Sequence, residues 1–254
     1  MKMVYNREIL INITGGNTMA LYDRNYLGAS ANDASFEEVG ARSEGALVAF
    51  VKQTYQLFAG SLLAATVGAY IGLGMASAIA SWYWGLVILE FALLFGLYFL
   101  KDKPGINLAL LFGFTFISGL TLTPILSKVL GMPGGASIVA QAFLLTTAIF
   151  GVMSIFALKT KKDLASMGKM LFIALIVVVI GSLINIFLGS PILQVAIAAI
   201  GAILFSLFIA YDTQNIVRGL YDSPIMAAIA LYLDFLNLFV SLLQLLGIFG
   251  NRDE

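Results

Sequence analysis

Two aspartates stand in stretches that are otherwise apolar, and they are the residues best placed to do chemistry. Asp234 lies within LYLDFLNLFVSL, residues 231–242, and no other charged residue occurs from Ile225 to Phe249. Asp212 lies in FIAYDTQNIV, near the end of the preceding apolar stretch. A carboxylate near the centre of a bilayer costs about 2.5–3.5 kcal/mol on insertion scales, so such a residue normally has a partner and a function.

The distances of the two aspartates from the turn between them predict that they meet. Asp212 precedes Arg218 by six residues and Asp234 follows Pro224 by ten, which places them about 9 Å and about 15 Å into the membrane at the rise of a helix. Two close carboxylates in a low dielectric resist double ionisation, so the pair is expected to share one proton in a hydrogen bond that joins the two helices. Loss of that proton would leave two repelling charges and push the helices apart, which would make a pH-dependent gate.

The polar face that begins at Asp234 continues along the same helix. Asp234, Asn237, Ser241 and Gln244 follow a 3-4-3 spacing, which puts all four side chains on one face. A stripe of this length does not suit a helix surrounded by lipid. It predicts either hydrogen bonds that hold the helix among its neighbours or a pathway for a cation or proton, and the carboxylate at one end favours the pathway.

The composition identifies the class of protein in which these residues work. Of 254 residues, 60% are hydrophobic and 11% are charged, and the mean hydropathy is +0.97, whereas a soluble domain carries about 25% charged residues. A net charge of zero argues against nucleic acid as a partner. The chain has no cysteine and no histidine, which excludes disulfides, thiol chemistry and histidine ligands. We therefore predict an all-α integral membrane protein in contact with the lipid bilayer.

Seven apolar stretches are long enough to cross the hydrocarbon, which takes about 20 helical residues. Charged or Gly- and Pro-rich breaks such as KDKPG, GMPGG and KTKKD separate them. We predict a polar, flexible cytoplasmic tail at 1–45, within which Met19 is an alternative start, and a seven-helix membrane domain at 46–254. The predicted spans are 56–79, 82–100, 106–127, 137–158, 168–188, 192–216 and 225–248.

The basic residues predict the orientation. With the N-terminus inside, the cytoplasmic segments hold eight lysines and arginines and the outer segments two, which is the bias of membrane proteins. We therefore expect the N-terminus in the cytoplasm and the C-terminus outside. The eight are Arg42, Lys52, Lys101, Lys103, Lys159, Lys161, Lys162 and Arg218, and the two are Lys128 and Arg252.

Small residues recur every four positions along the first and sixth of these spans, and they predict close packing of helix backbones. They are Gly60, Ala64, Gly68, Gly72, Ala76 and Ala80 in the first stripe, and Ala198, Ala202, Ser206 and Ala210 in the second.

Four segments, in order and at matching spacing, resemble the Bax inhibitor-1 (TMBIM) family, and its bacterial branch in particular. They are ILEFALLFGLYFLKDK, GFTFISGLTLTPIL, AYDTQNI and LYLDFLNLF. The resemblance implies six helices around a central seventh, and a passive, pH-sensitive calcium leak in a bacterial cytoplasmic (inner) membrane. Calcium would be the transported ion and no cofactor is implied. In this family the aspartates that match Asp212 and Asp234 form the pH sensor, and their carboxylates would also contact the calcium ion.

The resemblance assigns roles to two further residues. Lys101 matches the basic residue that latches onto the aspartate pair, although a bacterial member carries arginine there, and lysine lacks the bidentate fork of arginine. By itself Lys101 also fits an ordinary positive-inside residue. Glu90, eleven residues earlier, matches a carboxylate of the second helix and is a candidate for the ion path, or a buried acid bonded to neighbouring helices.

Three other functions are open to the same residues. Intramembrane aspartyl proteases also place Tyr-Asp on one helix and an aspartate on the next, and Tyr211-Asp212 fits that pattern. Leu231-Tyr232-Leu233 stands where those enzymes carry Gly-x-Gly, so we predict that the protein is not an enzyme. A proton-coupled cation antiporter would use the aspartates for turnover and would need a proton gradient. A non-conducting scaffold is the third, and no motif indicates a protein partner for it.

Overall fold

The computed structural model describes residues 44–250, with side chains up to residue 248, and within this range it contains helices and no strands. Seven segments are long and apolar enough to cross a membrane, which confirms the all-α membrane fold. The third is divided into two helices, and a short 3-10 helix opens the fifth. The elements are α2 (Glu44–Gly74), α3 (Ala76–Leu100), α4 (Ile106–Thr121), α5 (Thr123–Leu130), α6 (Gly135–Lys159), η2 (Leu164–Met167), α7 (Gly168–Leu188), α8 (Pro191–Val217) and α9 (Pro224–Gly250).

Most of the predicted tail, with Met19 and Arg42, lies outside the described residues, as does Arg252. The predicted boundary at residue 45 falls next to the first residues of α2, which begins at Glu44. Both the tail and its flexibility stay predictions.

The first two helices meet at a different residue from the one predicted. α2 ends at Gly74 and α3 begins at Ala76, so the break is at Met75 rather than after residue 79. The sequence around the predicted break, SAIASWYWG, contains no charge or proline that would mark a helix end. Ala76 and Ala80 therefore belong to α3, and the small-residue stripe of α2 ends at Gly72.

The third span is interrupted near its end. α4 stops at Thr121, and α5 starts at Thr123 with Pro124 in its first turn. Proline has no N–H to donate to the preceding turn, so the hydrogen-bond ladder is interrupted and a new helix begins here.

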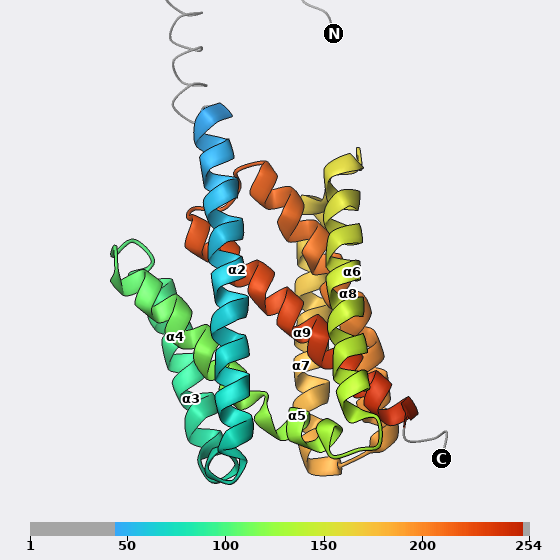
Figure 1. Ribbon diagram of the computed structural model, residues 1–254. Coiled ribbons are helices and arrows are strands. Elements are labelled where there is room, and N and C mark those ends of the chain that lie inside the picture. Colours follow the sequence, from blue (N-terminus) through green and yellow to red (C-terminus); the bar gives the residue numbers. More distant parts are fainter. Residues whose placement is uncertain (1–43, 251–254) are drawn as a thin grey trace, which may run out of the picture. The chain divides into compact units, whose positions relative to one another are not determined.

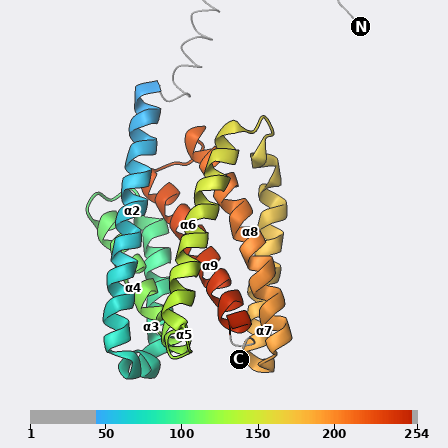
Figure 2. The same ribbon diagram turned by 45° about the vertical axis from the view of Figure 1, so that its right-hand side comes forward.

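α9 is the central helix of the membrane domain, as predicted. It runs obliquely through the bundle, between α2, α3 and α4 on one side and α6, α7 and α8 on the other (Figures 1 and 2). It packs on α8, α6 and α4. In the most apolar part of α9, 61% of the residues are buried, whereas the share is at most 39% in any other span.

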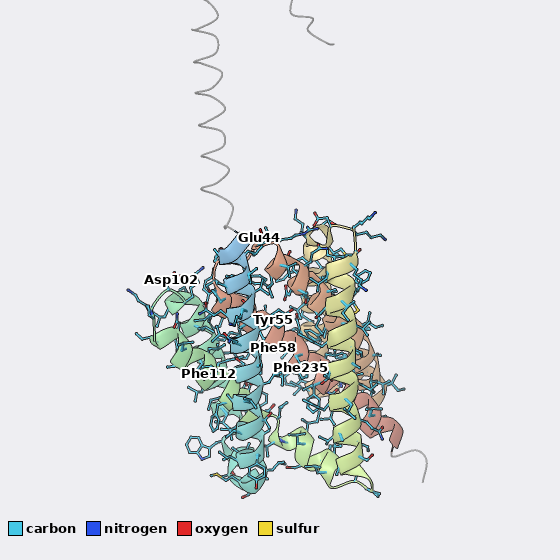
Figure 3. The ribbon with its side chains drawn as sticks, turned by 45° about the horizontal axis from the view of Figure 1, so that its top comes forward. Glu44, Tyr55, Phe58, Asp102, Phe112 and Phe235 are labelled. Carbon is cyan, nitrogen blue, oxygen red and sulfur yellow. The ribbon has the colours of Figure 1, made fainter. Side chains whose placement is uncertain are left out.

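Aromatic rings fill the space between α9 and its neighbours. Phe58 of α2 stacks on Phe150 of α6 with ring centroids 5.1 Å apart, and Phe235 of α9 meets both rings edge-on at 6.0 and 5.9 Å. Figure 3 shows Phe58 and Phe235 together in the middle of the bundle. In lipid, contacts of this kind stabilise a bundle through van der Waals packing rather than by removing apolar surface from water.

Glycines bring α2 and α4 into backbone contact. A Cβ at Gly68 would collide with the carbonyl oxygen of Phe116, and a Cβ at Gly119 would collide with the backbone of Ala65. A Cβ at Gly72 would collide with the hydroxyl of Thr123. The predicted packing role of the first stripe is confirmed at Gly68 and Gly72.

Gly119→Ala should destabilise the fold, because neither backbone can move aside to admit the methyl group. Overpacking of this kind costs about 1–3 kcal/mol. Gly151→Ala on α6 is the matched control, since nothing lies within 4 Å of the added Cβ. Thermal unfolding in detergent should show a lower Tm for Gly119→Ala and an equal or higher Tm for Gly151→Ala, and equal values would contradict the close α2–α4 contact.

Candidate functional site, a buried aspartate pair

The structure brings Asp212 of α8 and Asp234 of α9 together inside the membrane domain. Their carboxyl groups lie within hydrogen-bonding reach of each other, and each residue is only 5% exposed. The two helices pack closely along their length. Two carboxyl groups held this closely, away from water, cannot both carry a charge without a strong repulsion.

Tyr221, in the turn between α8 and α9, is a third member of the site. Its hydroxyl donates a hydrogen bond of 2.7 Å to Oδ1 of Asp212. Burial, followed by the charge of Asp212, raises the pKa of the Tyr221 hydroxyl, which keeps it a donor. Among the described residues, Oδ2 of Asp234 is buried without a hydrogen-bond partner.

The residues that follow Asp212 fix the end of α8 in place. Gln214 donates to the carbonyl of Lys162 at 3.0 Å and accepts from the backbone N–H of Leu164 at 2.7 Å. Thr213 lies 3.3 Å from the hydroxyl of Ser154 on α6. The motif AYDTQNI thus supplies one member of the pair and, in the next two residues, the contacts that hold that member against its neighbours.

Lys101 is placed on a carboxylate other than the expected pair. Its Nζ lies 2.8 Å from Oδ2 of Asp222, the residue after Tyr221. This hydrogen bond is the main cause of a raised pKa at Lys101. A second ion pair joins Arg218 to Asp163 and lowers the pKa of that aspartate. Both pairs are partly or largely exposed and lie in the loops that join the helices at one end of the bundle (Figure 1).

Glu90 contacts α4. Its Oε2 accepts a 3.0 Å hydrogen bond from the hydroxyl of Thr121. Also on α4, the Ser118 hydroxyl forms a short hydrogen bond with the hydroxyl of Tyr232 on α9. The Tyr232 hydroxyl also reaches the backbone carbonyl of Thr115 at 3.4 Å. Glu90 therefore belongs to a hydroxyl-rich contact of α3, α4 and α9, and its hydrogen-bond partner is on α4 rather than α8.

The rest of the predicted stripe lines a cavity. Asn237, Ser241 and Gln244 face a space of about 320 Å³ between α7, α8 and α9. The amide of Asn237 also donates to the carbonyl of Leu233 in its own helix at 2.7 Å. Gly201 of α8 lies against the hydroxyl of Ser241. The stripe therefore faces other helices rather than lipid. This placement agrees with an ion pathway and equally with hydrogen bonds that only hold α9 in place.

Sequence reasoning missed Tyr221 and Asp222. Both are ordinary turn residues by type, and only the fold brings them to Asp212 and Lys101. Their one signal is their position in RGLYDSP, directly between the two aspartate-bearing helices. In the part of the chain that the structure describes, no group of three or more carboxylates is arranged to hold a metal ion.

Six membrane-spanning helices around a buried seventh, with an aspartate pair at the contact of the last two, define an α-helical integral membrane protein. The profile of the family described as "Inhibitor of apoptosis-promoting Bax1" matches residues 47–251. The chain belongs to this Bax inhibitor-1 family.

Relatives in bacteria and in a virus support the assignment. A protein of Helicobacter pylori (strain ATCC 700392 / 26695) is 59% identical over 92% of this chain and 100% of its own length. The inner membrane protein YbhL of Escherichia coli K12 is 38% identical over 66% of this chain and 74% of its own length. The Golgi anti-apoptotic protein of vaccinia virus (strain Lister) is 36% identical over 63% of this chain and 66% of its own length.

Tyr221→Phe should weaken the link between the turn and α8. The change leaves the ring in place and removes the hydrogen bond from Tyr221 to Asp212. An unsatisfied buried acceptor costs about 1–3 kcal/mol. Thermal unfolding should show a lower Tm than wild type. Tyr70→Phe, at an exposed ring of α2, is the control and should match wild type; a similar result for both variants would remove Tyr221 from the site.

Proposed function

We propose that the protein is a passive, pH-sensitive calcium leak channel in which Asp212 and Asp234 are the pH sensor and gate. The observation that carries the proposal is the contact of two buried carboxyl groups between α8 and α9, one of which has an oxygen without a partner among the described residues. The polar face of α9 beyond this contact offers a route through the bundle.

The proton acts by deciding whether α8 and α9 attract or repel each other at this point. With one proton, the pair forms a hydrogen bond and the helices stay closed. When the proton is lost, two charges face each other in a low dielectric and the helices separate. A calcium ion that passes between the separated carboxylates would offset their mutual repulsion with its positive charge. Water would complete its six to eight oxygen ligands.

Lys101 acts as a latch through the turn rather than directly on the pair. It binds Asp222, whose neighbour Tyr221 binds Asp212. Lys101, at the end of α3, is thereby connected to Asp212 through Asp222 and Tyr221, two adjacent residues of the α8–α9 turn. Opening of α8 and α9 would move this turn and strain the Lys101–Asp222 contact.

We place the end of the bundle that carries these loops in the cytoplasm. The α3–α4, α6–α7 and α8–α9 connections hold Lys101, Lys103, Lys161, Lys162 and Arg218, as cytoplasmic loops do. The relative YbhL is named as an inner membrane protein, which supports the bacterial cytoplasmic membrane as the location.

The packing around Asp234 does not favour a protease. Leu231 and Tyr232 are completely buried, so these two side chains fill the space that small residues would leave for a peptide backbone. A proton-coupled antiporter is separated from a leak by experiment: a leak carries calcium down its gradient at equal pH on both sides, whereas an exchanger requires a proton gradient.

Calcium flux into proteoliposomes, measured with an indicator from acidic to mildly alkaline pH, tests the sensor. Wild-type flux should fall as the pH is lowered. Asp212→Asn and Asp234→Asn mimic the protonated acid, so each should give low flux with little pH response, and the double variant should add little because the pair titrates as one unit. Asp234→Ala, which also removes the hydrogen bond, should leak at every pH.

The matched control for this series is Asp102→Asn, an exposed aspartate of the α3–α4 loop, which should keep the wild-type profile. A double Asn variant with a wild-type pH profile would remove the sensor from this pair. Flux that appears only with a proton gradient would identify an exchanger instead.

Charge changes at Lys101 and Asp222 test whether their contact acts as a latch on the channel. Lys101→Ala and Asp222→Asn should each raise basal flux, Lys101→Arg should keep it low, and the swap Lys101→Asp with Asp222→Lys should restore it at least in part. Lys103→Ala is the control for losing a basic residue from the same loop. If Lys101→Ala and Asp222→Asn both match wild type, Lys101 serves only as a topology signal.

A further inference from the structure

Two cavities lie among α7, α8 and α9 on the side of the aspartate pair away from the basic loops, and the first of them reaches Asn237, one turn from Asp234. One, of about 320 Å³, is lined by Ser182 of α7 together with the α9 residues Asn237, Ser241 and Gln244. The other, of about 340 Å³, shares Ser182 and Gln244 and adds Asn185 and Gln194. These named side chains are polar and uncharged, and such groups can hydrate a cation without binding it tightly. The remaining residues of both linings are apolar.

An apolar cluster adjoins the first of these cavities and, along α8, stands between that cavity and Asp212. Phe205 and Ile209 of α8 pack with Leu238 of α9, at 8%, 0% and 0% exposure. Phe205 also lines the first cavity. Along α8 the order is Phe205, Ile209, then Asp212, one turn apart each; along α9, Leu238 comes one turn after Asp234.

We infer that this cluster, the apolar plug of Phe205, Ile209 and Leu238, is the barrier that stops calcium in the closed protein. The inference rests on the proposed leak function and adds the residues that block it. The aspartates would then set the separation of α8 and α9, and the plug would respond to it.

The physical basis is the cost of bringing an ion past side chains that offer it no oxygen. Hydrophobic constrictions close channels by excluding water even where a small gap exists. The plug is contributed by the same two helices that the aspartates join. Ile209 is three positions from Asp212, Leu238 is four positions from Asp234, and Phe205 lies one further turn along α8. Separation of α8 and α9 at the pair must therefore widen the contact of Ile209 with Leu238.

Polar substitution of the plug should open it. Leu238→Asn is expected to raise basal calcium flux several-fold at neutral pH, because the amide wets the constriction. Phe205→Ala should raise flux as well, by widening the contact without adding a polar group. The matched control is Leu111→Asn on α4, because this leucine is equally buried but lies in a different cluster. Its calcium flux should stay at the wild-type level. The Tm of each of the three variants shows whether it still folds.

Cysteine labelling gives a second readout that does not depend on flux. The chain has no cysteine, so single variants are clean probes. In proteoliposomes, Gln244→Cys and Ser241→Cys should react with a small water-soluble thiol reagent, whereas Ile209→Cys should not react until Leu238→Asn is added to it.

The outcomes separate the plug from the leak. If wild type conducts calcium but Leu238→Asn and Phe205→Ala behave like Leu111→Asn, the plug is wrong and the proposed function stands. Reaction of Ile209→Cys in the otherwise unchanged protein would likewise show that water already reaches this level. If neither wild type nor the plug variants conduct, both the leak and its barrier are refuted.

Discussion

The contact between Asp212 and Asp234 requires that two acids be kept out of water and close together, and much of the surrounding structure follows from that requirement. Burial alone would only neutralise the two groups. Here Tyr221 supplies a hydrogen bond to one of them, and the end of α8 is fixed by the bonds of Gln214 to the α6–α7 connection. The pair is therefore held by a fixed frame on the α8 side.

The position of α9 explains why this contact can matter to the whole bundle. α9 carries its polar stripe through the centre, with α8 along one side and the hydroxyl groups of α4 on another. On the other side, Gly68 and Gly119 lock α2 and α4 by backbone contact, which leaves little freedom there. Movement at the aspartates would consequently be expressed between α8 and α9 rather than between α2 and α4.

Sequence reasoning located the spans and the pair, because both depend on local signals: apolar length for the helices, and distance from one turn for Asp212 and Asp234. It misplaced the α2–α3 break, since no charge or proline marks Met75. It did not anticipate the partners in the turn, because the pairing of Lys101 with Asp222 joins residues 121 positions apart. The apolar plug was also invisible, as Phe205, Ile209 and Leu238 look like any other membrane-helix residues until their neighbours are known.

The Lys101–Asp222 pair differs from the aspartate pair in one respect that has its own consequence. Its side chains are 24% and 79% exposed, so dissolved ions reach it, and the attraction between its charges declines as the Debye length shortens, from about 10 Å at 0.1 M salt to about 3 Å at 1 M. The buried carboxyl groups have no such exposure. The two contacts that we propose to hold the closed state would thus respond to different properties of the surrounding solution, one to its acidity and the other to its ionic strength.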